Sequence, residues 1–335
     1  MKTLNHHQPT KKIHIAFSDI STSHAGLLKS LVKIDQCELR YYDKREKPIF
    51  DFIEEFKPSI FLYGDQDQEN ETFLSACNEI KNKTGLVLFT NNVIKNKYID
   101  LNPDLVCSTR EQPASEMIRK NMERQGVKFK VLDDYGYVED NSKRITDEKF
   151  NSDICYHFSV LENNKLTHKL YEYDVANPQT RHEYYLYLNA LDKISKNHRL
   201  KIVGNSGRTL PIPQYLGKIK EDRILTFLNS SKICLDLFGG NVLHQAINGI
   251  FSLCYDENDL FPTIDIKNID AQLKEIINDP SFRKDTVKKA QEKVFNTKNT
   301  SYHRLLEIFN LVKSNTILTN GIKEKIEETK CSLGL

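Results

Sequence analysis

Residues suited to holding a phosphate gather between Lys201 and Glu257. Gly204 ends a short apolar run and lets the backbone come close to a ligand, and Arg208 adds a cation in the loop that follows. Three residues that favour a tight turn come after a second apolar run: Gly239, Gly240 and Asn241. If a helix begins there, its first backbone N–H groups attract an anion. The segment predicts a phosphate or sugar site, against the plainer alternatives of an ordinary turn and a surface arginine.

The elements that would position these residues alternate between strand and helix. Three apolar runs have strand character: Lys201 to Val203, Ile233 to Phe238 and Ile250 to Tyr255. Two helices are predicted between them: Asp222 to Asn229, and Asn241 to Asn248, which Gly249 ends. Strands joined through helices form a parallel sheet, and ligands of such sheets bind at the carboxyl ends of the strands. We therefore expect the loops after Gly204 and after Phe238 to line the site.

The N-terminal half shows the same alternation over a longer stretch. Strands are predicted at residues 13–17, 37–42, 59–63, 86–89, 104–107 and 128–132. Helices are predicted at residues 23–32, 47–56, 71–83 and 113–125. Strict alternation is typical of a parallel sheet with helices on both faces, so this half predicts a Rossmann-like domain of the α/β class.

A charged, aperiodic segment between Asp133 and Ser152 separates the two alternating regions. The chain has 335 residues, and single cores tend to split beyond roughly 250 to 300 residues. We therefore expect an N-terminal Rossmann-like domain over residues 1–150 and a C-terminal one over residues 151–318. Residues 319–335 are expected to form a further helix or a frayed end.

Composition excludes several classes of protein. No apolar stretch approaches the roughly 20 residues that span a bilayer, and the polar start lacks a signal-peptide apolar region, so we expect a cytoplasmic protein. The seven cysteines are scattered without zinc-ligand spacing, which favours buried reduced thiols and no metal site. The net charge of +2 does not indicate a protein that binds nucleic acid. A local basic groove is an alternative that this small net charge still allows.

The order of several short segments in the C-terminal half resembles a known family. The segments are DICYHF, QTRHEYYLYLNAL, LKIVGN, YLGKIKEDRILTFLNSSKICLDL, IFSLCYDE and SYHRLLEIF. They resemble the donor half of GT-B glycosyltransferases, with the spore-maturation-type glycosyltransferase family nearest and the phage β-glucosyltransferases that modify DNA bases more distant. The resemblance covers roughly residues 151 to 312. It implies two Rossmann-like domains facing across a cleft, with a nucleotide-sugar donor held mostly by the C-terminal one.

The resemblance also implies donor-binding positions. Arg181 stands where the family has a diphosphate-binding arginine, and Arg208 and the turn from Gly239 to Asn241 could share that charge. Many retaining GT-B enzymes, and the phage enzymes, have a ribose-binding glutamate five residues before the glycine that ends the helix, and here that position holds His244. A histidine can hydrogen-bond a hydroxyl but does not replace both carboxylate oxygens. The change indicates either altered donor recognition or lost activity, and a half-buried helix histidine with no ligand role is the structural alternative.

The N-terminal domain is expected to bind the acceptor. Asn91 stands where the phage enzymes have a catalytic aspartate, and an amide is not a base at neutral pH. His24, in the loop after the first strand, is the better candidate for a catalytic base, since other GT-B enzymes use this loop; Gly26 beside it would let a substrate approach. A histidine that only caps the following helix is the structural alternative. The carboxylates of Asp65 and Asp67 receive no role.

Three functions follow from these observations. The first is a glycosyltransferase with a nucleotide sugar, expected to be UDP-linked, as its substrate and with no cofactor or tightly bound metal. The second is a GT-B-like binding or assembly protein without activity, and the third is a nucleotide-dependent enzyme of another class, such as an epimerase. The acceptor and the oligomeric state stay open. DNA is a possible but not favoured acceptor, for which a few cations would contact phosphates: Lys95, Lys97, Arg119, Lys120 and Arg124.

Overall fold

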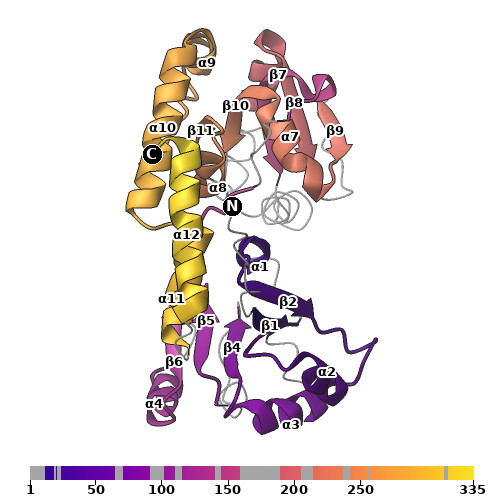
Figure 1. Ribbon diagram of the computed structural model, residues 1–335. Helices are drawn as coiled ribbons and strands as arrows, with labels where there is room; N and C mark the ends of the chain where they lie inside the picture. Colours follow the sequence, from indigo (N-terminus) through magenta and orange to yellow (C-terminus); the bar gives the residue numbers. More distant parts are fainter. Residues whose placement is uncertain are drawn as a thin grey trace, which may run out of the picture. The chain divides into compact units, whose positions relative to one another are not determined.

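The computed structural model describes residues 12–18, 20, 24–64, 71–90, 102–109, 115–139, 145–158, 189–204, 214–236, 242–255, 257–312 and 316–335. The chain folds into two compact units (Figure 1). The first unit combines residues 1–137 with residues 298–335, and the second unit comprises residues 138–297. Each unit contains one parallel sheet, and each is described by itself below.

The sheet of the first unit has six strands in the order β2-β1-β3-β4-β5-β6, and every neighbouring pair is parallel. The strands are β1 (Ile13–Phe17), β2 (Cys37–Tyr41), β3 (Ile60–Gly64), β4 (Gly85–Thr90), β5 (Leu105–Ser108) and β6 (Lys128–Val131). The helices are α1 (Ala25–Val32), α2 (Ile49–Phe56), α3 (Glu71–Ile80), α4 (Glu116–Arg124), α11 (Ser301–Leu311) and α12 (Thr316–Leu333). All residues of β3 and β4 are buried, as expected for strands that are covered on both faces.

The sheet of the second unit has five strands in the order β11-β10-β7-β8-β9, again all parallel. The strands are β7 (Ser152–Phe158), β8 (Leu200–Gly204), β9 (Tyr215–Lys218), β10 (Ser231–Asp236) and β11 (Ser252–Cys254). The helical elements are η4 (Glu148–Phe150), η5 (Glu221–Arg223), α7 (Ile224–Asn229), α8 (Val242–Ile247), α9 (Ile269–Asn278) and α10 (Pro280–Asn296), together with residues 189–197.

Alternate residues of the second sheet enter two separate cores. Ile154 and Ile233 pack on one face with residues of the helical stretch 189–197 and of α9. Cys155 and Cys234, one position further along, pack on the other face with Phe227 of α7. This alternation is what a strand imposes, because successive side chains point to opposite faces. The expected fold class, two Rossmann-like α/β domains, is confirmed by the two parallel sheets.

The division of the chain differs from the expected boundaries at residues 150 and 318. Residues 138–150 join the second unit, because the Glu139 N–H donates to Asn248 Oδ1 (3.0 Å) and Phe150 packs edge-on against Phe227. Residues 298–318 join the first unit, where the Ser301 N–H donates to the Gly136 carbonyl (2.9 Å). The chain therefore leaves the first unit, builds the second, and returns to complete the first.

Two local expectations also need correction or sharpening. Strand β9 was not predicted, because its residues alternate between half-buried and exposed and carry no apolar run; Figure 1 shows it at the edge of its sheet. The C-terminal tail is a full helix, α12, whose Leu318 and Ile322 are buried, and not a frayed end.

All seven cysteines are free thiols, six of them buried and Cys331 exposed. Among the helices that the structure describes, none combines the length and apolar character that crossing a bilayer takes.

Candidate functional site

The strand order of each sheet reverses at one point. In the first sheet the chain adds β2 on one side of β1 and β3 on the other. In the second sheet it adds β8 and β9 on one side of β7, then β10 and β11 on the other. Ligands of open parallel sheets bind beyond the carboxyl ends of the strands at such reversals, because the two crossover connections diverge there and leave room. These two places are where a site is expected.

Only three of the predicted site residues fall within the described part of the chain: His24, Gly204 and His244. Asn91, Arg181, Arg208, Gly239, Gly240 and Asn241 lie outside the described residues, and their roles stay predictions. His24 belongs to the first unit, while Gly204 and His244 belong to the second. Each of the three lies at the end of a parallel strand or in the connection that follows one.

His24 lies next to the reversal point of the first sheet, directly before α1. Its side chain is 1% exposed and makes no capping hydrogen bond to α1, which argues against the capping alternative. The imidazole instead packs against Phe89 of β4, with ring centroids 4.9 Å apart and ring planes inclined by 58°. The histidine therefore faces the interior of the unit.

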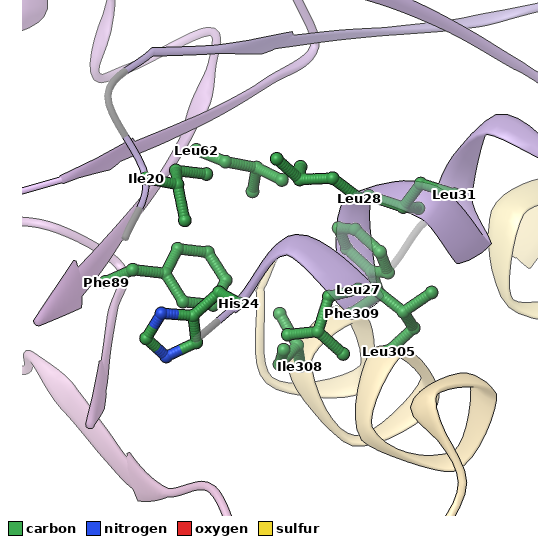
Figure 2. Close-up of a pocket in the computed structure, with 10 residues that line it drawn as sticks. All are labelled: Ile20, His24, Leu27, Leu28, Leu31, Leu62, Phe89, Leu305, Ile308 and Phe309. Atoms are coloured by element: carbon green, nitrogen blue, oxygen red, sulfur yellow. The ribbon is translucent and has the colours of Figure 1, made fainter. Parts of the chain in front are cut away.

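A small pocket of about 10 Å³ lies beside His24 (Figure 2). Of the ten lining residues that the structure describes, His24 alone is polar. The apolar ones come from α1, the strands β3 and β4, the segment after β1, and α11: Ile20, Leu27, Leu28, Leu31, Leu62, Phe89, Leu305, Ile308 and Phe309. This volume is on the order of one water molecule and far below the roughly 300 Å³ or more of ordinary ligand sites, so a substrate could reach His24 only if the apolar lining moves apart.

The sequence did not reveal the apolar part of this pocket. Three of its lining residues belong to α11, more than 250 positions away from His24 along the chain. Their spacing in the sequence marks only an amphipathic helix, and nothing in it says which strand or loop they cover.

Gly26 does not leave room for a substrate, contrary to expectation. A Cβ at this position would lie 3.1 Å from the ring of Tyr137 and 3.2 Å from that of Tyr135. The close approach that Gly26 allows is therefore made by two tyrosines of the same unit. Lys29 of α1 adds to this packing, with Nζ 5.0 Å from the centre of the Tyr137 ring.

Gly204 ends β8 at the carboxyl edge of the second sheet. A Cβ there would lie 2.9 Å from Tyr215 Oη, so the glycine makes room for a side chain of β9. Its carbonyl accepts a hydrogen bond from the Ile219 N–H (2.9 Å). Packing of the edge strand is thus sufficient reason for a glycine here, and a role in donor binding stays a prediction.

His244 lies in α8, in the connection that follows β10. The side-chain amide nitrogen of Asn248 lies 3.1 Å from His244 Nδ1, and the amide oxygen of Asn248 accepts from the Glu139 N–H. Because an amide nitrogen only donates, Nδ1 accepts, and a neutral ring then carries its proton on Nε2. The half-buried ring is oriented as a hydrogen-bond donor rather than as the acceptor that a glutamate would be.

Of the cations considered for a DNA backbone, three lie on α4, while Lys95 and Lys97 lie outside the described residues. Lys120 on α4 pairs with Glu116 of the same helix at 2.8 Å. Exposed pairs of this kind contribute little to stability, but the carboxylate reduces the positive field of the helix. The described geometry adds no support for a DNA acceptor.

Comparison with known proteins gives weak likenesses only. No protein-family model and no curated protein matches the chain. Among solved structures, the chain is similar to the spinosyn forosaminyltransferase SpnP (11% identity, 89% of this chain, 99% of that chain, TM-score 0.42). It is also similar to the UDP-GlcNAc 2-epimerase from Neisseria meningitidis bound to UDP-GlcNAc (12% identity, 86% and 99%, TM-score 0.40). At these values the likenesses identify no activity, and the fold class is taken from the strand order of the two sheets.

Proposed function

We propose that the protein is a glycosyltransferase that moves a sugar from a nucleotide-sugar donor, UDP-linked, to an acceptor hydroxyl. The observation that carries the proposal is the position of His24 beside the strand-order reversal of the first sheet, where it is the one polar residue among the described residues that line a small apolar pocket. A second parallel sheet with its own reversal supplies a second place for a ligand, as a reaction between two substrates needs. The order of short segments in residues 151 to 312 adds the resemblance to GT-B donor domains.

In the proposed reaction, His24 accepts the proton of the acceptor hydroxyl while that oxygen bonds to the anomeric carbon of the sugar. The bond from this carbon to the diphosphate breaks, and the nucleotide diphosphate leaves with the electron pair. Arg181, Arg208 and the turn from Gly239 to Asn241 are assigned to the charge of the leaving diphosphate. His244 donates to a donor hydroxyl, and Gly204 lets the donor approach the end of β8. Asn91 orients the acceptor.

A screen of UDP-, GDP-, ADP- and TDP-sugars, read by thermal shift and by nucleotide release, tests the proposal. A donor present at 100 times its Kd stabilises the fold by about 2.7 kcal/mol, which shifts the melting temperature by several degrees. Release of free nucleotide with the sugar retained on an acceptor is the expected result. If neither sugar nucleotides nor free nucleotides change the melting temperature, the proposal is wrong.

His244 and Asn91 favour one alternative, a GT-B-like binding protein without activity, since both depart from the family's residues. The same screen separates the two functions. A sugar nucleotide that stabilises the protein, with no nucleotide released in the presence of a broad acceptor mixture, would indicate the binding protein.

A further inference from the structure

The way in which α8 ends places Asn248 beside His244. Gly249 has a positive φ of 76°, and the Ile250 N–H donates to the Gln245 carbonyl (3.0 Å). A hydrogen bond of this span around a left-handed glycine is the mark of the Schellman motif, which ends many helices. Asn248 is therefore the C-cap residue of α8. It follows His244 by four positions, so the two side chains lie on the same face of the last helical turn.

Two backbone groups fix the orientation of the Asn248 side-chain amide. Its nitrogen lies 2.8 Å from the His244 carbonyl, which only accepts, and its oxygen lies 3.0 Å from the Glu139 N–H, which only donates. Exchanging the amide oxygen and nitrogen would bring two acceptors together at one end and two donors together at the other. Asn248 is 5% exposed, and such a mismatch inside a protein costs free energy. Backbone atoms thus determine the orientation of the amide independently of the imidazole.

The amide in turn determines which ring nitrogen of His244 carries the proton. The Asn248 amide nitrogen has two hydrogens, one for the His244 carbonyl and one for His244 Nδ1, which lies 3.1 Å away. A neutral imidazole that accepts at Nδ1 holds its proton on Nε2. A proton on Nδ1 would instead point at the N–H group of Asn248. The contact therefore stabilises one of the two ring tautomers.

The side chain of Asn248 is not required to end the helix. Its own backbone N–H already donates to the His244 carbonyl (3.3 Å), and the Schellman motif uses the carbonyls before it. The side chain adds a connection over 109 positions of sequence, because Glu139 lies in the segment by which the chain enters the second unit. One amide thus joins the entering segment, the last turn of α8 and the His244 ring.

We propose that Asn248 is a positioning residue, which holds the proton of the His244 ring on Nε2 and so makes His244 a hydrogen-bond donor toward the nucleotide sugar. The inference rests on the proposed function, in which His244 belongs to the donor site. Asn248 acts only through the ring. It selects the tautomer, and the tautomer determines that the atom which His244 recognises is an acceptor oxygen.

Nitrogen NMR of the isotopically labelled full chain reads the tautomer, because ring nitrogens with and without a proton have well-separated chemical shifts. Spectra are recorded at about pH 8, where an imidazole is ordinarily neutral. The protein has ten histidines, and the signals that are missing from His244→Gln are those of His244. This measurement needs no ligand, so it tests the tautomer separately from the proposed function.

Two variants exchange an amide for a carboxyl group. Asn248→Asp keeps an acceptor for the Glu139 N–H but replaces the donor that faces the His244 ring with an acceptor. Gln291→Glu is the matched control. Gln291 is also buried and also contacts α8, but it donates to the Ile247 carbonyl (3.4 Å).

We expect the wild type to carry the His244 proton on Nε2, Asn248→Asp to carry it on Nδ1, and Gln291→Glu to keep the wild-type tautomer. Kd values for UDP-, GDP-, ADP- and TDP-glucose measure the consequence. For the sugar nucleotide that binds, Asn248→Asp should raise Kd about two- to tenfold, as the loss of one hydrogen bond implies, and Gln291→Glu should not change it. In a His244→Gln background, Asn248→Asp should have no further effect on Kd, because it acts through the ring.

A wild-type ring with its proton on Nδ1 overturns the inference without any variant. The inference is also wrong if Asn248→Asp keeps the wild-type tautomer, or if it raises Kd equally in the His244→Gln background, which would indicate a structural role. If the wild-type proton is on Nε2 but none of the four sugar nucleotides binds, the proposed function fails and the inference fails with it. Should Asn248→Asp not fold, the wild-type spectrum decides the matter.

Discussion

His24 is set apart from the other candidate residues by its surroundings. It is a polar group enclosed by leucine, isoleucine and phenylalanine side chains, and its ring packs against that of Phe89. An imidazole in such a place has either a packing role or a chemical one. A substitution by glutamine distinguishes the two roles. Glutamine fills similar space and forms hydrogen bonds, so it would preserve a packing role, but it does not accept a proton and would not preserve a role as a base.

We predict that His24→Gln lowers the rate of sugar transfer by about 10² to 10⁴-fold, the range that a general base contributes. Binding of the nucleotide sugar should be unchanged, because the residues proposed to bind the donor belong to the second unit. Transfer rates and donor Kd values of the purified variant check this. His14→Gln, which alters a histidine of β1 outside the pocket, is the control and should keep the wild-type rate. An unchanged rate in His24→Gln would show that the histidine only packs.

His303 is expected to make the free energy of unfolding depend on pH. Burial, with the positive charges of Lys330, Lys298 and Arg304, lowers the pKa of His303 to about 4 from an ordinary 6.5. Its Nδ1 lies 2.7 Å from the Thr300 hydroxyl, which can donate to the neutral ring. Between pH 6.5 and about pH 4 the unfolded chain binds a proton that the folded chain does not, so the free energy of unfolding falls as the pH falls.

The variant His303→Asn should lose less stability across this window, because it keeps an acceptor for Thr300 and has no proton to gain. Urea denaturation midpoints at pH 4, 5, 6 and 7 for both proteins provide the measurement. Carboxylates titrate in the same range but are common to both, so the difference between the curves isolates the histidine. Curves that run parallel from pH 4 to pH 7 would contradict the low pKa.

At the scale of elements, α11 is the helix that completes the first unit. Its Ser301 hydroxyl lies 2.6 Å from the Ser30 hydroxyl of α1, and Lys128 of β6 donates to the Leu311 carbonyl (2.6 Å). Arg304, 3% exposed, donates to Asn299 and Glu307 and lies near Asp133. The contacts with Ser30, Asp133 and Lys128 thus attach the helix to the rest of the unit, as do the apolar pocket residues.

Close packing between α11 and β4 can be tested with a rescue experiment. A Cβ at Gly85, the first residue of β4, would lie 2.6 Å from Val312 Cγ1, directly after α11. We predict that Gly85→Ala destabilises the protein by about 1 to 3 kcal/mol, the usual cost of overpacking. In the double variant with Val312→Ala, the new methyl group fills the vacated space, so the combined loss should be smaller than the sum of the single losses.

Urea denaturation of the wild type, both single variants and the double variant gives the coupling free energy. Additive losses would show that Gly85 and Val312 do not contact each other. Gly126→Ala offers a comparison, because a Cβ there meets no atom within 4 Å and its cost comes from its positive φ of 72° alone.

For the whole molecule, the important fact is that the chain returns to its first unit after building its second. The sequence neighbours α10 and α11 belong to different units, because residue 297 ends the second and residue 298 resumes the first. A destabilising substitution should therefore affect the elements of its own unit, and not the elements that are next to it only in the sequence.

We predict that Ile308→Ala in α11, at a position that is 1% exposed, costs about 2 to 5 kcal/mol. Amide hydrogen exchange of the full-length protein should become faster in β1, β3 and α1, while α10 and β10 keep their protection. The reciprocal variant, Leu273→Ala in α9, should accelerate exchange in the second unit only. Equal acceleration in both units after Ile308→Ala would refute the division.

The amino-acid sequence by itself determined the alternation of strands and helices, and hence two parallel α/β sheets. This information is local, because apolar runs of strand length, helical periodicity and ending glycines such as Gly249 each act within a few residues. The prediction failed at β9, whose alternating exposure at the sheet edge leaves no apolar run to recognise.

Only the tertiary structure decided which residues meet. It placed α11 over α1 and enclosed His24 with side chains from the far end of the chain, it gave Gly26 and Gly204 tyrosine neighbours, and it brought Cys234 opposite Cys155. These outcomes depend on strand order, register and long-range packing. No single short segment of the sequence determines these contacts. The free energy that selects them comes from burying apolar surfaces that lie far apart in the sequence.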